Sequence, residues 1–202
     1  MLSQINKKYI CDLFQEYLDD YSVGWKALWW EWTYEQEKRF EILLNNLTLS
    51  EDSTFLDLWC GTGDLFEYIR KNWLKLRYTW MDILKESINI AHSRFQDADF
   101  SYGETSDIWE WKYDYIVASG IFAVNIENAK KIYFNMIKEV FKKSKKGFIF
   151  NMLRDDFLLP NAPEIIQMNP IEVTEYCGNF CSKIIIEKNY LPIDFTIWLY
   201  HV

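Results

Sequence analysis

Glycine is scarce in this sequence of 202 residues: it has 7, against roughly 14 at the usual frequency of about 7%. Proline and cysteine are also few, with 4 residues each. The sequence lacks the run of roughly 18 apolar residues that a membrane-spanning helix needs. Because 50% of the residues are hydrophobic, a disordered chain is excluded as well, and the length suits one domain with a substantial core.

Side chains that bind metals are few. Cys177 and Cys181 are one helical turn apart, a spacing that could support a metal pair. The sequence has no Cys-x-x-Cys motif, however, and only two histidines, His92 and His201, are there to complete such a site. We therefore expect free, buried thiols in a reducing cytosol and no metal.

Basic residues are outnumbered, with 22 Lys and Arg against 30 Asp and Glu, which gives a net charge of −8. A phosphate backbone repels such a chain, so nucleic acid is not expected as a partner. Residues 1–9 are polar and no apolar run follows them, so nothing indicates export. We expect a cytoplasmic protein without a membrane partner.

The hydrophobic pattern changes near residue 50. Before it, apolar residues at helical spacing predict two helices, the second over 33–47, with an aromatic-rich, irregular stretch at 22–32 between them. After it, short apolar runs alternate with helical patterns. Strands are predicted over 54–59, 76–81, 99–102, 113–119, 148–152, 184–187 and 195–201, and helices over 62–71, 84–95, 129–143 and 170–180.

This order predicts an α/β fold, a doubly wound, Rossmann-like sheet of seven mostly parallel strands. The last connection is short, so the final two strands should form an antiparallel hairpin. We expect a single domain, with residues 1–50 as an N-terminal helical cap and residues 51–202 as the α/β core. Four lysines (Lys142, Lys143, Lys145, Lys146) are expected to complement the C-terminal dipole of the helix over 129–143.

The loop after the first predicted strand carries the most informative motif. Residues 57–63 read Asp-Leu-Trp-Cys-Gly-Thr-Gly, and a helix follows. Such a turn lets a ligand approach the backbone and meet the free N–H groups of the helix N-terminus. The second strand ends at Asp82, where an acid can accept hydrogen bonds from the hydroxyls of a ribose. Taken alone, Asp82 is equally well explained as an acid at a helix N-terminus before Leu84.

These features indicate a cofactor that contains a nucleoside. NAD is disfavoured because Phe66 stands where a dinucleotide fingerprint has its third glycine. The motif instead resembles Asp/Glu-x-Gly-x-Gly-x-Gly, the first motif of class I S-adenosylmethionine-dependent methyltransferases. Residues 78–83, 102–105 and 113–122 are similar to later motifs of that family. Gly24-Trp25, residues 37–40 and residues 190–196 resemble a small-protein subgroup, so the resemblance covers nearly the whole chain.

The resemblance implies roles for the residues of the first two motifs. Gly61 and Gly63 would line the methionine part of S-adenosylmethionine. Asp57 would orient the loop and approach the ammonium group of the cofactor. Asp82 would bind the ribose, and Ile83 would lie beside the adenine.

Further positions are implied by the later motifs. Glu104 and Thr105 would face the adenine edge, and Ser119 would lie near the sulfonium. Arg39 matches an arginine of the subgroup and would contribute to the cofactor site, although a surface helix arginine is an equally good interpretation. The resemblance assigns no catalytic base.

Tryptophan stands at several glycine positions of the family pattern. Trp59 replaces the first glycine of the loop, Trp80 the glycine before Met81, and Trp73 and Trp111 lie where glycine would be ordinary. A ring at position 59 would crowd the ligand, and overpacking costs on the order of 1–3 kcal/mol.

Two explanations compete for these tryptophans. One is a degenerate methyltransferase that has lost or altered its cofactor site. The other is translation: UGA means glycine in some bacterial lineages, and reading it as tryptophan would give this pattern. The counts favour the second, because 7 Gly and 10 Trp make 17, close to about 14 Gly plus roughly two to three Trp.

We therefore expect a methyltransferase that uses S-adenosylmethionine and acts on a small molecule. The alternative is a catalytically degenerate protein of the same fold that acts by interaction. A DNA acceptor is disfavoured, since residues 119–122 read Ser-Gly-Ile-Phe where amino-methylating DNA enzymes have Asn/Asp-Pro-Pro-Tyr. The acceptor and the oligomeric state are not predicted.

Overall fold

The computed structural model describes residues 2–21, 33–72, 75–110, 112–157, 159 and 162–202. The irregular stretch at 22–32, with Gly24 and Trp25, and the tryptophans at 73 and 111 lie outside them. The elements are α1 (Gln4–Tyr21), α2 (Thr33–Asn45), β1 (Thr54–Leu58), α3 (Asp64–Lys71), β2 (Arg77–Asp82), α4 (Lys85–Arg94), β3 (Phe100–Tyr102), β4 (Tyr113–Ala118), α5 (Ala129–Lys143), β5 (Ser144–Leu153), α6 (Pro170–Gly178), β6 (Lys183–Glu187) and β7 (Asp194–Tyr200).

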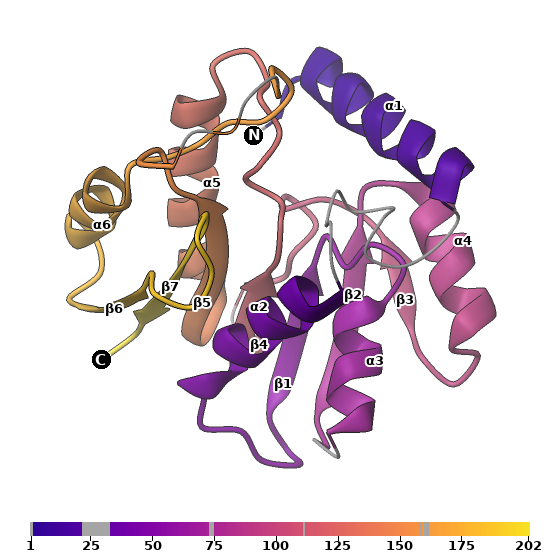
Figure 1. Ribbon diagram of the computed structural model, residues 1–202. Coiled ribbons are helices and arrows are strands. Elements are labelled where there is room, and N and C mark those ends of the chain that lie inside the picture. The colour runs from indigo at the N-terminus through magenta and orange to yellow at the C-terminus, as the bar shows by residue number, and fades with distance from the viewer. Residues whose placement is uncertain (1, 22–32, 73–74, 111, 158, 160–161) are drawn as a thin grey trace.

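Seven strands form one sheet in the order β3-β2-β1-β4-β5-β7-β6 (Figure 1). Neighbouring strands from β3 to β5 pair in parallel, whereas β7 is antiparallel to both β5 and β6. The predicted doubly wound, mostly parallel sheet with its C-terminal hairpin is therefore confirmed. The strand order reverses between β1 and β4, which is where sheets of this kind bind ligands.

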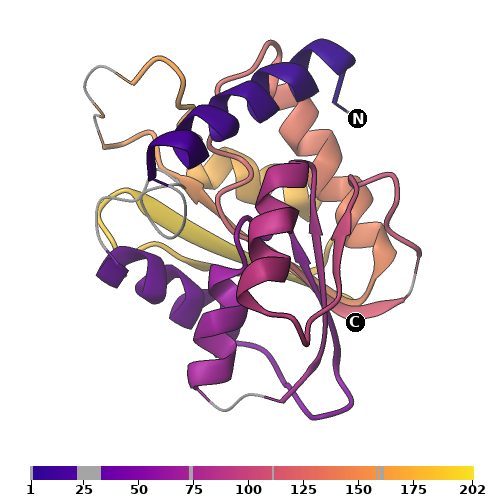
Figure 2. The same cartoon turned by 90° about the vertical axis from the view of Figure 1, so that its right-hand side faces the viewer.

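Helices cover both faces of the sheet, because alternate residues of each central strand point to opposite sides. On one face Leu56, Ile116 and Phe148 pack with residues of α5 and α6. On the other face Phe55 and Tyr115 pack with residues of α2 and α3. Helix α1 runs across the top of the molecule (Figures 1 and 2).

The lysine-rich segment after α5 differs from the prediction. The helix ends at Lys143, and Ser144 already has the extended angles φ −80° and ψ 153° as the first residue of β5. Lys145 and Lys146 therefore belong to the strand and not to the helix end. Lys143 does lie there, but its ammonium group donates to carbonyls of the segment before β4, including that of Ile108 at 2.9 Å.

No helix in the described part of the chain is both long enough and apolar enough to cross a membrane.

Candidate functional site

Three residues of the loop between β1 and α3 have a left-handed backbone. Their φ angles are 61° at Trp59, 56° at Gly61 and 89° at Gly63. Glycine adopts such angles without steric penalty. A Cβ at position 63 would also lie only 3.0 Å from the ring of Phe95. The two glycines thus meet a requirement of this turn, and the same requirement recurs at position 59.

Asp82 fastens this loop to the end of β2. Its carboxylate accepts hydrogen bonds from the backbone N–H groups of Gly61 and Leu84, each at 2.8 Å. Burial raises the pKa of Asp82 to about 6, although these backbone donors lower it. The contact to Leu84 is the one expected of an acid at a helix N-terminus. Because a carboxylate offers about four lone pairs, acceptor capacity remains for a ligand's hydroxyls.

Asp57 lies buried near the end of β1, on the strand that enters the loop. Its carboxylate accepts a hydrogen bond from the hydroxyl of Tyr78 at 2.9 Å. Burial raises the pKa of Asp57 to about 7, which the bond from Tyr78 offsets only in part. The group therefore titrates near neutral pH, and a cation bound beside it would favour its charged form.

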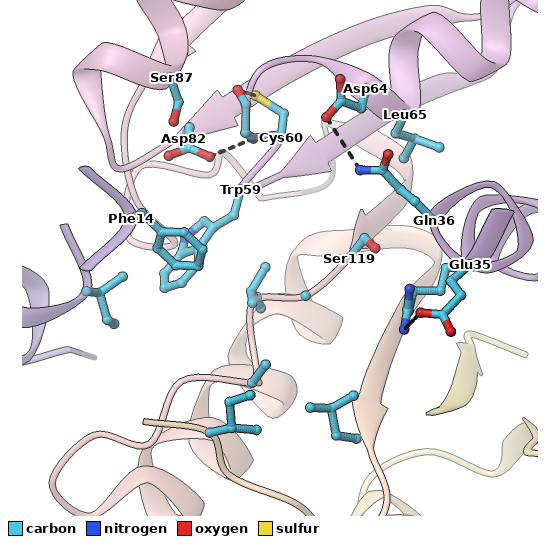
Figure 3. Close-up of a pocket in the computed structure, with 18 of the residues that line it drawn as sticks. Phe14, Glu35, Gln36, Trp59, Cys60, Asp64, Leu65, Asp82, Ser87 and Ser119 are labelled. Atoms are coloured by element: carbon cyan, nitrogen blue, oxygen red, sulfur yellow. Dashed lines mark hydrogen bonds and ion pairs between the residues drawn. The ribbon is translucent and has the colours of Figure 1, made fainter. Parts of the chain in front are cut away.

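A pocket of about 490 Å³ opens beside the loop (Figure 3). Near the loop its lining is acidic, with Asp57, Asp64 and Asp82. Much of the remaining lining is apolar and comes from α1 and from the segments that follow β4 and β5, for example Phe14 and Ile121. The volume lies within the range of small-molecule sites, roughly 300–1,000 Å³.

The structure brings six of the predicted site residues to this pocket: Asp57, Gly61, Asp82, Ile83, Ser119 and Arg39. Gly63 shapes the turn without being among the lining residues of the described chain. Glu104 and Thr105 are not among the described lining residues either. Glu104 forms an ion pair with Lys7 of α1, and the carbonyl of Thr105 accepts a hydrogen bond from Lys143 at 2.9 Å. The cofactor roles of all these residues stay predictions.

Arg39 is fully buried, so its interpretation as a surface arginine is wrong. Its Nε and Nη2 atoms donate to both carboxylate oxygens of Asp194, at 2.8 and 2.7 Å. Burial raises the pKa of Asp194, and the guanidinium of Arg39 works against that rise. The pair joins α2 to the start of β7 at the wall of the pocket, and a bidentate pair of this kind is a strong contact.

Four polar residues of the pocket were not predicted from the sequence: Glu35, Gln36, Asp64 and Ser87. Asp64 accepts a hydrogen bond from Arg94 at 2.6 Å and a longer one from Gln36 at 3.4 Å. An acid directly after the last glycine of the loop, at a helix N-terminus, was a usable signal for Asp64. Gln36 had no such signal, because only packing decides which face of α2 meets the pocket.

Trp59 is the residue of the loop that does not fit a cofactor. A bulky side chain at φ 61° is an outlier and costs on the order of 1–3 kcal/mol. Its side chain is among those that line the pocket, in the loop that the resemblance assigns to the methionine part of the cofactor. Gly61 and Gly63, by contrast, have left-handed angles that suit glycine and add no side chain to the loop.

Trp59 and Trp80 both have an unfavourable feature at their indole N–H groups. The indole N–H of each is buried and has no hydrogen-bond partner among the described residues. A buried donor without a partner costs about 1–3 kcal/mol. The fully buried Trp198 has no such defect, since its indole N–H donates to the carbonyl of Leu43 at 3.2 Å.

The buried thiols of Cys177 and Cys181 lie at α6 and just beyond it. Burial raises the pKa of Cys177 to about 12, so this thiol stays protonated at neutral pH. Within the described ranges, no three side chains of His, Cys, Asp or Glu come together in a way that could hold a metal ion.

Comparisons with known proteins agree with this architecture, although no protein-family model matches the chain. A Mycobacterium tuberculosis protein named as a putative methyltransferase is 34% identical over 150 residues, which cover 70% of this chain and 89% of that protein. Two solved structures show the same fold. Magnesium protoporphyrin IX methyltransferase of Synechocystis, solved with S-adenosylmethionine bound, has a TM-score of 0.71 at 12% identity and matches 100% of this chain and 99% of its own.

The second structure is the small RNA methyltransferase HEN1, with a TM-score of 0.66 at 13% identity over 83% of this chain and 25% of its own. The names of these two enzymes point to very different acceptors, a porphyrin and an RNA. The fold therefore does not identify the acceptor. The sequence relative, the sheet order and the loop after β1 together identify the family: the chain belongs to the class I S-adenosylmethionine-dependent methyltransferases.

Proposed function

We propose that this methyltransferase transfers the methyl group to a small-molecule acceptor. The observation that carries the proposal is the pocket of about 490 Å³ beside the loop after β1. S-adenosylmethionine supplies a methyl group on a sulfonium, so the transfer needs mainly the correct placement of the acceptor. Away from the loop, the lining of this pocket is largely apolar. A pocket of this size and lining suits a small, partly apolar molecule.

The charge of the pocket supports a small acceptor over a nucleic acid. Glu35, Asp57, Asp64 and Asp82 all line it, and the whole chain carries a net charge of −8. A phosphate backbone that approached this opening would be repelled. The same acids favour a ligand with a positive charge, as the ammonium and sulfonium groups of the cofactor have.

Placement of the acceptor falls to the segment after β4. The side chain of Asn151 in β5 accepts from the backbone N–H of Gly120 at 2.8 Å and donates to the hydroxyl of Ser119 at 3.2 Å. These bonds hold Ser119 at the pocket wall, where the resemblance places the reacting methyl group. Neither histidine is among the described lining residues: the ring of His92 packs against Phe100, and His201 stacks on Phe141.

A catalytically degenerate protein that acts by interaction is the second candidate. The misfit of Trp59 favours it, because an indole in the loop would obstruct the cofactor. This candidate requires tryptophan to be the residue that the cell places at position 59.

The test is methyl transfer from labelled S-adenosylmethionine, run with the chain as printed and with Trp59→Gly. Each is offered small-molecule acceptors, a short RNA and a DNA duplex. We expect label in small molecules and none in the nucleic acids. A matched control is Asp52→Asn, because this exposed carboxylate lies outside the pocket and pairs with Arg77.

Label found in RNA or DNA and in no small molecule would overturn the small-molecule assignment. If S-adenosylhomocysteine binds to neither chain in a calorimetric titration, the degenerate candidate takes first place.

A further inference from the structure

The backbone at position 59 has the conformation of a glycine. Left-handed angles recur at every second residue of the loop, at 59, 61 and 63, and two of these three residues are glycine. The N–H group of Trp59 is also fixed by a hydrogen bond to the carbonyl of Met81 at 2.6 Å. Relaxation of the backbone at position 59 would break this hydrogen bond, so the strain stays at Trp59.

The three described tryptophans with a buried indole N–H fall into two groups. The indole N–H of Trp198 has its acceptor in the carbonyl of Leu43, as a tryptophan selected for the core should. Trp59 and Trp80 are buried at their indole N–H with no partner among the described residues. The rings at 59 and 80 thus contribute apolar surface but lack the polar contact that normally accompanies it.

The ring of Trp80 is well surrounded, with the rings of Phe66 and Phe100 each centred 4.5 Å away. Packing therefore does not distinguish it from an ordinary core residue. The unpaired N–H and the place of Trp80 in β2, directly opposite Asp57 in the strand register, do distinguish it. Both unusual tryptophans thus flank the carboxylates of the site.

We propose that positions 59 and 80 are glycine in the protein that the cell makes, with UGA codons that its genetic code assigns to glycine. The left-handed angle at 59, the two unpaired indole N–H groups and the excess of tryptophan over glycine have one common explanation in this assignment. With glycine at 59, all three left-handed positions of the loop carry glycine, and the indole no longer occupies the pocket. Trp198 is assigned as a true tryptophan.

The first experiment reads the codons and the peptide masses of the protein isolated from its source. We expect UGA at 59 and 80 and UGG at 198. The tryptic peptide over residues 78–85 should be lighter than the printed sequence by the difference between one tryptophan and one glycine residue, and so should the peptide over 40–70. A UGG codon, or the mass of tryptophan, at 59 or 80 would overturn the assignment at that position.

The second experiment compares the printed chain with Trp59→Gly, Trp80→Gly, the double variant and Trp198→Gly as the matched control. We expect Trp59→Gly to have a higher urea midpoint than the printed chain, because glycine adopts the left-handed angle without strain, and Trp198→Gly to have a lower one or to fail to fold. S-adenosylhomocysteine should bind the double variant at least tenfold more tightly than the printed chain. A fall in midpoint for Trp59→Gly comparable to that of Trp198→Gly would contradict the proposal.

The inference and the proposed function fail separately. UGA codons and glycine masses, with no binding of S-adenosylhomocysteine by the glycine chain, would leave the inference standing and overturn the cofactor-dependent function. UGG codons would overturn the inference whatever the chain binds.

Discussion

The carboxyl group of Asp57 is the clearest case of a residue whose chemistry is set by its surroundings. In an unfolded chain it has a pKa near 3.8, and burial beside Tyr78 raises this pKa to about 7. A buried acid with a raised pKa holds its proton in the folded state at a pH where the unfolded chain has released it. Folding then takes up a proton, and stability depends on pH.

The sign of this dependence follows directly. Between about pH 3.8 and pH 7 the native state binds more protons at Asp57 than the unfolded state, so the free energy of unfolding falls as the pH rises. For Asp57→Asn we expect this fall to become smaller, by on the order of 1–3 kcal/mol across the window. Urea denaturation at a series of pH values measures it.

Asp52→Asn, at an exposed carboxylate paired with Arg77, is the matched control and should leave the slope unchanged. A slope that is equally steep in the native chain and in Asp57→Asn would show that Asp57 is not the group that titrates.

Among the elements, α2 is joined to the start of β7 by a buried ion pair, in addition to its apolar packing on the sheet. The side chains of Arg39 and Asp194 are both buried, at 0% and 1% exposure. Removing one member leaves a buried charge without compensation, so we expect Arg39→Met to lower the free energy of unfolding by about 3–5 kcal/mol. Replacing both, as Arg39→Met with Asp194→Leu, should recover much of this loss.

Chemical denaturation of the three chains checks the prediction. The exposed pair of Arg77 and Asp52 gives the comparison, since Arg77→Met should cost less than about 1 kcal/mol. If the double replacement is no more stable than Arg39→Met alone, the loss does not arise from an uncompensated charge.

The contact between β5 and β7 depends on a glycine. A Cβ at Gly147 would lie 2.5 Å from the carbonyl oxygen of Leu199, which is backbone and cannot move aside. We expect Gly147→Ala to lower the free energy of unfolding by roughly 1–3 kcal/mol. Gly178→Ala is the matched control, because nothing lies within 4 Å of a Cβ there, and in α6 it should gain up to about 1 kcal/mol.

Thermal or urea unfolding of both variants distinguishes the two glycines. Equal midpoints for Gly147→Ala and the native chain would mean that the strands separate easily at this point.

At the scale of the whole molecule, the parallel order of β1, β2 and β4 gathers residues that are distant in the sequence. Asp57 lies one residue before the end of β1, Asp82 ends the neighbouring β2, and Ser119 follows β4 on the other side of β1. The α1 helix adds Phe14 from the N-terminal part of the chain. The pocket thus results from the topology, and each of its walls comes from a different part of the sequence.

The strands and helices of the core were predictable because they have strong hydrophobic periods and turn residues at their ends. The loop after β1 was predictable because glycine has a distinct steric role there. The start of β5 was not: Lys145 and Lys146 resemble a helix end by composition, and only the pairing of Ser144 with Tyr113 shows that the strand has begun. Local composition cannot report a partner more than thirty residues away.

The sequence by itself determined the family, the order of the elements and the loop that would hold the cofactor, because these follow from short-range patterns. Only the tertiary structure decided that Arg39 is a buried partner of Asp194, that Glu104 pairs with Lys7, and that Asp57 titrates near neutral pH. It also assigned Trp59 a glycine's backbone. Burial and long-range pairing set these properties, and both arise only when segments far apart in the chain are packed together.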